Sequence, residues 1–206
     1  MKKIQKQYEN KIIIEKSIFI TRLFRANNQD EINSYLEEIR KKHFDATHNC
    51  YAYILGENQD IQKASDDGEP QKTAGAPMLE VLKRNNMTNI LAIVTRYFGG
   101  TLLGASGLIK AYSDSVSLCL LKATIYETKK MNLFSLTLSY SGYNTILKAI
   151  PYINISNVSF TDNVTIEAYC DIDKYNNLKD ELYKYKIDPS ALIDLGYKEI
   201  EIEIKK

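Results

Sequence analysis

The stretch that decides the fold of the first half of the chain runs from an apolar segment into a glycine-rich turn. It reads Ile90-Leu91-Ala92-Ile93-Val94-Thr95-Arg96-Tyr97-Phe98-Gly99-Gly100-Thr101-Leu102-Leu103-Gly104-Ala105-Ser106-Gly107. Its first five residues are all apolar, which is typical of a strand covered on both faces. The residues beyond it place one apolar stripe on a long helix, formed by Leu108, Ile109, Tyr112, Val116, Cys119 and Leu120. The stretch therefore predicts a strand that feeds a helix within a mixed domain.

The rest of the first half supports the same class of domain. Its predicted elements are strands at residues 8–14 and 17–24, a helix around residues 32–39, a strand at 49–55, a loop at 65–73 and a helix from Pro77 to about Arg84. Proline suits the first turn of a helix because its missing amide hydrogen has no partner there. We expect helices packed on a sheet that contains the 90–94 strand.

The second half has a clearer pattern. Apolar and polar residues alternate over some segments, with the period of a half-buried strand, and recur at three and four residues over others, with the period of a helix. The predicted elements are a strand at 134–140, a helix at 143–150, strands at 153–160 and 164–170 joined by a turn at 161–163, a helix at 175–185 and a strand at 200–204. This βαββαβ order is that of a ferredoxin-like domain.

A change in residue usage indicates a boundary between two domains. The second half holds only Gly142 and Gly196 of the nine glycines but eight of the 15 tyrosines. We therefore predict an α+β protein with domains at residues 1–128 and 129–206.

Composition excludes several classes of protein. The net charge is +1, which gives no strong basic field of the kind that tight, non-specific nucleic-acid binding needs. No apolar run approaches the roughly 18 residues that span a membrane, and no apolar signal segment follows the basic start. Cys50, Cys119 and Cys170 lie too far apart to form a zinc pattern or a disulfide framework. A cytoplasmic protein without membrane, metal or cofactor is the expectation.

Three carboxylates within four positions form the first candidate site: Asp66, Asp67 and Glu69. Clustered acids repel one another unless they are solvated, paired or bound to a cation. One interpretation is an Asp-Gly turn with solvated acids. The other is a hard-cation site, which together with His48 would suit a metal-assisted hydrolase.

The glycine-rich turn forms the second candidate site. Glycines between a buried strand and a helix let backbone amides approach an anion at the positive end of the helix, while an arginine adds charge and aromatic rings can stack on bases. The residues predicted to bind an anion or a nucleic acid are Arg96, Tyr97, Phe98, Gly99, Gly100, Thr101, Gly104 and Lys110. The alternative is tight turn geometry with Phe98 in the core. The glycine spacing matches neither a dinucleotide fingerprint nor a phosphate-binding Walker loop.

His48 and Cys50 lie two residues apart, so on a strand their side chains share a face. That arrangement does not by itself aim the imidazole at the thiol, and no orienting acid is apparent. We interpret His48 as a structural residue rather than the base of a cysteine nucleophile.

Several of these segments together resemble the YigZ/IMPACT family over about residues 15–125. The matching segments are Lys16–Ile20, Ala46–Tyr53, Ser65–Pro70, Thr73–Gly75, Val94–Gly100 and Leu103–Tyr112. The resemblance implies a first domain with the ribosomal-protein-S5-domain-2-like fold, similar to the fourth domain of elongation factor G. It implies a ferredoxin-like second domain, similar to the fifth domain of that factor.

The resemblance also bears on function. It implies no firmly assigned activity for bacterial two-domain members, and for eukaryotic relatives a role in translational control through a separate partner-binding domain. We expect a non-catalytic binding protein whose partner is RNA or a ribosomal component, with a role in translation regulation. The alternatives are the metal-assisted hydrolase and a regulator that binds a protein partner. We also expect the acidic segment and the glycine-rich turn to lie together, with Arg96 supplying the positive charge.

Overall fold

The computed structural model describes residues 1–204, which divide into two compact units. The first unit holds residues 1–127 together with Glu203 and Ile204, and the second holds residues 128–202. The division after Glu127 falls one residue before the predicted domain boundary. Each unit has its own hydrophobic core. None of the helices in residues 1–204 has the length and apolarity needed to cross a membrane.

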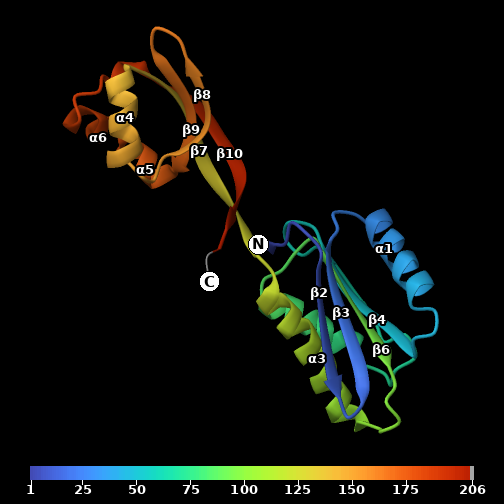
Figure 1. The fold of residues 1–206 in the computed structure, drawn as a ribbon. Helices are drawn as coiled ribbons and strands as arrows, with labels where there is room; N and C mark the ends of the chain where they lie inside the picture. Colours follow the sequence, from blue (N-terminus) through green and yellow to red (C-terminus); the bar gives the residue numbers. More distant parts are fainter. Residues whose placement is uncertain (205–206) are drawn as a thin grey trace. The chain divides into compact units, whose positions relative to one another are not determined.

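The first unit is an antiparallel sheet with helices on both faces (Figure 1). Its strands are β2 (Tyr8–Ile14), β3 (Ser17–Arg25), β4 (His48–Leu55), β5 (Ile61–Ser65) and β6 (Ile90–Tyr97), in the order β2-β3-β6-β4-β5. Its helices are α1 (Gln29–Lys42), α2 (Gly75–Arg84) and α3 (Gly104–Lys122). Helix α1 covers one face and α3 the other (Figure 1).

Strand β6 is the central strand, which explains its continuous apolar sequence. Ile90, Ala92 and Val94 belong to the core shared with α2 and α3, whereas Leu91 and Ile93 belong to the core under α1. All five side chains are fully buried. The prediction of a strand covered on both faces is therefore confirmed.

Strand β5 was not predicted, because nothing in its sequence marks a buried face. It pairs only with β4, at the edge of the sheet. Its first three residues are exposed, and its last two, Ala64 and Ser65, are half-buried. An edge strand with little burial carries no apolar alternation, so the segment resembles a loop.

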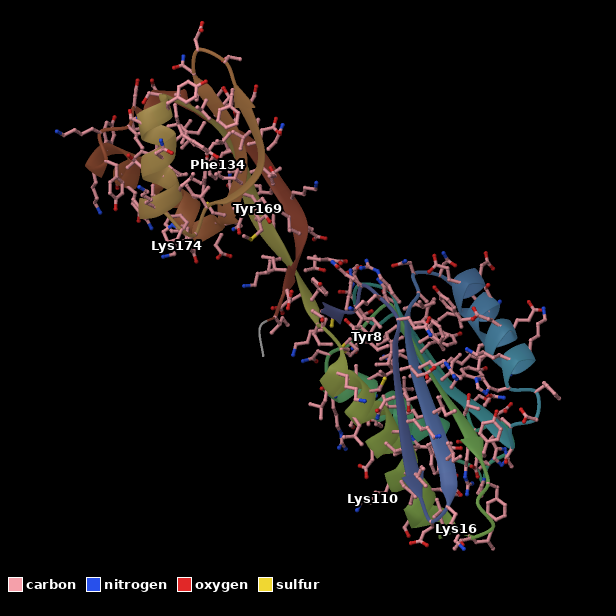
Figure 2. All side chains as sticks on the ribbon, viewed as in Figure 1. Tyr8, Lys16, Lys110, Phe134, Tyr169 and Lys174 are labelled. Carbon is pink, nitrogen blue, oxygen red and sulfur yellow. The ribbon has the colours of Figure 1, made fainter. Side chains whose placement is uncertain are left out.

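The second unit is ferredoxin-like, as predicted. Its elements are β7 (Tyr126–Leu138), α4 (Tyr140–Ala149), β8 (Asn154–Phe160), β9 (Val164–Asp171), α5 (Ile172–Asn176), α6 (Leu178–Lys184), a short 3₁₀ helix (Pro189–Ala191) and β10 (Leu192–Glu203). The sheet has the order β10-β7-β9-β8, and β1 (Lys2–Lys3) pairs with the first two residues of β7, which belong to the first unit. Phe134 lies in the core between this sheet and its helices (Figure 2).

Some predicted bounds in the second unit are wrong. The single helix predicted at 175–185 is two short helices that meet at Asn177, and it begins earlier, at Ile172. The last strand begins at Leu192 rather than near residue 200, since its first part is largely exposed and lacks clean alternation. The α+β class with two sheets is confirmed.

Because each unit has its own core, we expect a core substitution to destabilise only the unit that contains it. Phe134→Ala should destabilise the second unit by about 3–5 kcal/mol, because it removes a fully buried ring. Hydrogen exchange followed by mass spectrometry should show lost protection in β7 and β9 and unchanged protection in β6. The matched variant Leu91→Ala should do the reverse. Equal loss of protection in both units would contradict the division.

Candidate binding site at the end of strand β6

Three strand ends meet where the candidate residues lie. In the sheet register Arg96 of β6 lies opposite His48 of β4 on one side and opposite Phe19 of β3 on the other. Residues opposite one another in a ladder point to the same face, and Phe19 belongs to the core beneath α3. The side chains of His48 and Arg96 therefore point together toward α3, whereas Tyr97 points to the opposite face.

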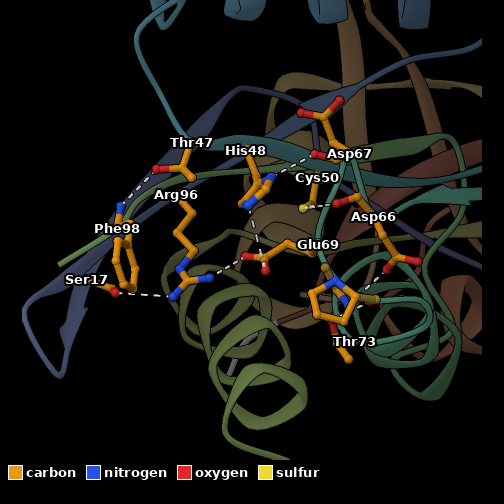
Figure 3. Close-up of polar contacts among 12 residues, drawn as sticks. Ser17, Thr47, His48, Cys50, Asp66, Asp67, Glu69, Thr73, Arg96 and Phe98 are labelled. Atoms are coloured by element: carbon orange, nitrogen blue, oxygen red, sulfur yellow. Dashed lines mark hydrogen bonds and ion pairs between the residues drawn. The ribbon is translucent and has the colours of Figure 1, made fainter. Parts of the chain in front are cut away.

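A buried ion pair forms the centre of the site. Arg96 Nη1 donates to Glu69 Oε1 at 2.6 Å, and only 6% and 3% of the two side chains are exposed (Figure 3). Arg96 Nη2 donates to Ser17 Oγ at 3.3 Å. The Tyr112 hydroxyl of α3 donates to the same Glu69 oxygen at 2.8 Å. A buried ion pair needs such extra hydrogen bonds to offset the loss of hydration.

The acidic segment and the glycine-rich turn thus lie together, as predicted. Glu69 meets Arg96 directly, and its second oxygen lies 3.8 Å from His48 Nε2. Arg96 supplies the positive charge that Glu69 needs. His48 also contacts this segment through Nδ1, which lies 2.8 Å from the carbonyl oxygen of Asp67.

The other two acids have structural partners. The Asp66 carboxylate accepts hydrogen bonds from the backbone amides of Lys72, Ala74 and Gly75 at 2.8–3.0 Å, which satisfies amides at the start of α2. Asp67 Oδ2 accepts from the amide of Asn49 at 2.7 Å. The interpretation of these two acids as solvated turn residues is therefore incomplete.

The three carboxylates do not converge on one point. Within residues 1–204 there is no group of three or more His, Cys, Asp or Glu side chains placed to hold a metal ion. The donors that these acids already bind are protein amides, a hydroxyl and a guanidinium. The geometry therefore gives no support to the metal-assisted hydrolase.

Cys50 is a poor nucleophile. Its thiol is fully buried and lies 3.0 Å from the carbonyl oxygen of Asp66 and 3.3 Å from the Tyr112 hydroxyl. Burial raises the pKa of the thiol to about 12, and burial likewise raises the pKa of the Tyr112 hydroxyl far above its ordinary value. Since the thiolate is the reactive form, the pair His48 and Cys50 is not organised for catalysis.

The glycine-rich turn is held by hydroxyl groups from the neighbouring strands. The amide of Phe98 donates to Thr47 Oγ1 at 3.0 Å, and the amide of Gly99 donates to Ser17 Oγ at 3.1 Å. Gly99 must be glycine, because a Cβ there would lie 2.0–2.3 Å from the backbone of Lys16 and Ser17. Gly100 has φ +88°, a conformation that favours glycine.

A pocket of about 380 Å³ opens beside this turn. Most of its wall is apolar, whereas its polar groups come from the ion pair and its neighbours. The lining residues are Thr47, His48, Gly68, Glu69, Pro70, Arg96, Phe98, Leu102, Leu103, Gly104, Ala105 and Leu108. Phe98 is 46% exposed, so the alternative that placed it in the core is wrong.

The pocket brings together five of the sequence-predicted residues: His48, Glu69, Arg96, Phe98 and Gly104. Five others lie near it but outside its lining: Asp66, Asp67, Gly99, Gly100 and Thr101.

Two further predicted residues are not part of the pocket lining. Tyr97 hydrogen-bonds His43 and Asp45, on the other face of the sheet. Lys110 projects outward from α3 (Figure 2).

Sequence reasoning missed several residues of the site. Ser17 and Tyr112 bind the ion pair, but Ser17 lies 79 positions from Arg96 and Tyr112 lies 43 positions from Glu69, so no local pattern connects them. Leu102 is 87% exposed and lines the pocket. An apolar residue inside a polar, glycine-rich turn was the available signal.

The comparisons with known proteins concern this same region. A model of the Impact N-terminal domain matches residues 15–120. The chain is 43% identical over 171 residues to IMPACT family member YvyE of Bacillus subtilis, covering 82% of this chain and 78% of that protein. It is 40% identical over 129 residues to IMPACT family member YigZ of Escherichia coli, covering 62% of this chain and 63% of that protein.

A solved structure extends the similarity to the second unit. The crystal structure of a hypothetical protein matches 96% of this chain and 97% of its own, with 29% identity and a TM-score of 0.59. The match therefore covers both units.

The buried ion pair predicts a large cost for removing one partner. Glu69→Gln should lower the free energy of unfolding by about 3–5 kcal/mol, because it leaves the charge of Arg96 buried without its counter-ion. Urea denaturation measures the change. The matched variant Glu80→Gln removes a carboxylate that is 53% exposed and paired with Lys83, and it should cost less than about 1 kcal/mol. Similar costs for the two variants would contradict the importance of the pair.

The buried thiols predict a pH effect. Burial raises the pKa of Cys50 and Cys119 from 9.0 to about 12, and that of Cys170 to about 11. Because the unfolded thiols lose protons first, this contribution to stability should be complete below about pH 9 and be lost as the pH rises toward 12. Labelling with a thiol reagent at pH 8 should be slow in the folded protein and rapid in urea. Rapid labelling of Cys50 in the folded state would show that its thiol is reactive.

Proposed function

The chain belongs to the IMPACT family, and from that premise we propose that it is a non-catalytic protein that binds single-stranded RNA, free or within a ribosomal component, with a role in translation regulation. The proposal assigns the binding to the pocket beside the glycine-rich turn. Its volume of about 380 Å³ lies within the range of about 300–1,000 Å³ usual for small-ligand sites. A pocket of that size can accept a single base.

The exposed ring of Phe98 carries the proposal. The ring stands at the pocket with 46% of the residue exposed, and the guanidinium of Arg96 lies 5.6 Å from its centre. The turn that presents it is fixed by Thr47 and Ser17, so the ring is positioned before a ligand arrives. Aromatic side chains on a rigid support are the usual stacking surface for bases of single strands.

Groups suited to phosphate lie around the pocket. Helix α3 begins at Gly104 without a side-chain hydrogen bond to its first turn, and such amides favour an anion. Lys16, which is exposed and adjoins Gly99, and Lys110 on α3 add positive charge. The net charge of only +1 predicts modest affinity that weakens with salt.

The chemistry of the site favours binding over catalysis. The Cys50 thiol and the Tyr112 hydroxyl hold their protons because burial raises the pKa of each. The carboxylates of Asp66 and Asp67 are bound to backbone amides. The thiol, the hydroxyl and these two carboxylates are therefore engaged in structural contacts and are not free to act as nucleophiles.

Phe98→Ala tests the proposal. Removing the ring should weaken binding of a fluorescein-labelled single-stranded RNA hexamer of mixed sequence by about 1–3 kcal/mol, the usual contribution of one stacked base. Fluorescence anisotropy at low salt measures the affinity. The matched control is Phe44→Ala, which removes a phenylalanine that is 84% exposed and does not line the pocket, and it should leave affinity unchanged.

Lys110→Ala tests the phosphate contacts. It should weaken binding and reduce the slope of log affinity against log salt by about 1, as expected for one lost phosphate contact. Lys41→Ala is its control, since this side chain is 75% exposed on α1, on the other face of the sheet. Absence of salt-dependent binding by the unaltered protein would refute the RNA proposal and leave a protein partner as the ligand of the pocket.

A further inference from the structure

Among the polar groups that line the pocket, the feature that bears on ligand choice is the set of hydrogen-bond acceptors without a partner in the part of the chain that the structure describes. Nδ1 of His48 lies 2.8 Å from the carbonyl oxygen of Asp67. A carbonyl oxygen can only accept, so Nδ1 must carry a proton and donate. In the neutral imidazole the other nitrogen, Nε2, then has a lone pair and acts as an acceptor.

The nearest ionisable partner of that nitrogen is also an acceptor. Glu69 Oε2 lies 3.8 Å from His48 Nε2, which is beyond hydrogen-bonding distance. The other oxygen, Oε1, already accepts from Arg96 and Tyr112. Both Nη atoms of Arg96 donate within the protein, to Glu69 and to Ser17, and its Nε has no hydrogen-bond partner within residues 1–204 but is buried.

The pocket therefore offers acceptors to a ligand. Arg96 and Glu69 cancel each other's charge, so the pair has no net attraction for a phosphate. His48 and Glu69 both line the pocket, with 19% of the His48 side chain and 3% of the Glu69 side chain exposed. Two acceptors 3.8 Å apart are close enough for a single amino group to donate one hydrogen to each.

We propose that this pocket selects bases that carry an exocyclic amino group, and that His48 Nε2 and Glu69 Oε2 are the acceptors that read it. The inference rests on the proposed RNA binding and names the base class that the same site takes. Adenine and cytosine present an amino group, whereas uracil presents a carbonyl oxygen in the corresponding position. That oxygen would face two further acceptors and be repelled.

The two parts of the site then have separate roles. Phe98 stacks on any base, since every base has a flat aromatic face. The acceptor pair adds discrimination, because a site built to receive a hydrogen bond rejects a ligand that cannot donate it. We expect cytosine and adenine to be favoured over uracil by about tenfold.

The experiment compares three fluorescein-labelled RNA hexamers made only of A, only of C or only of U. Fluorescence anisotropy should give affinities for the A and C hexamers about tenfold higher than for the U hexamer. His48→Asn should abolish that preference by weakening only the A and C hexamers. Asparagine can still donate to the carbonyl oxygen of Asp67 from the position of Nδ1, but it has no atom in the position of Nε2.

A conservative variant distinguishes loss of base recognition from loss of protein stability. His48→Gln places an amide oxygen near the position of Nε2 and should restore part of the preference. The His48→Asn and His48→Gln variants should have the same thermal stability. Nitrogen NMR of the free protein should find the proton of His48 on Nδ1 only. A ring protonated on both nitrogens would overturn the proposal, because Nε2 would then be a donor to Glu69.

The outcomes distinguish this inference from the proposed function. Equal binding of the three hexamers, or a preference that survives His48→Asn, would overturn the base selection and leave RNA binding in place. No binding of any hexamer would overturn both. Binding of an arginine-containing peptide without RNA binding would also overturn both, since a guanidinium offers donors to the same acceptors.

Discussion

The first unit depends on one buried ion pair, between Arg96 at the end of β6 and Glu69 in the loop before α2. Both side chains are almost fully buried, so each charge is tolerated only because the other is present. The contacts of the pair reach Ser17 at the start of β3, His48 at the start of β4 and Tyr112 within α3. The ion pair thus holds together segments that are far apart in the sequence, and these segments form the walls of the pocket.

The loop that delivers Glu69 is itself fixed by the other two acids. Asp66 holds the start of α2 through three amides, and Asp67 holds the start of β4 through the amide of Asn49. The carboxylates repel one another less than their spacing suggests, because each has its own donors. An acidic cluster that looks like a cation site in the sequence is here a set of three anchors for the backbone.

The sequence carries enough information for the central strand and for the ferredoxin-like unit, because both bury regular faces. Residues 90–94 are buried on both faces of the sheet, and Phe134, Leu136 and Leu138 are buried on one. It gives no periodic signal for β5, because the side chains of that strand are buried only slightly. For the site, alternation along β6 already separates Arg96 from Tyr97, but the 46% exposure of Phe98 depends on hydroxyl groups contributed by Thr47 and Ser17. Such long-range contacts leave no periodic signal.

The same ion pair limits what the pocket can recognise. A free arginine at the start of a helix would attract phosphate, yet here Glu69 neutralises the charge of Arg96 and accepts a hydrogen bond from its Nη1. Attraction for anions is left to the amides of α3 and to the lysines outside the pocket. In the lining of the pocket, the acceptors are a lone pair of the partly exposed His48 and an oxygen of the nearly buried Glu69, 3.8 Å apart. Because the carboxylate that stabilises the fold is also the acceptor that a ligand would meet, selection in this pocket must follow hydrogen-bond donors rather than charge.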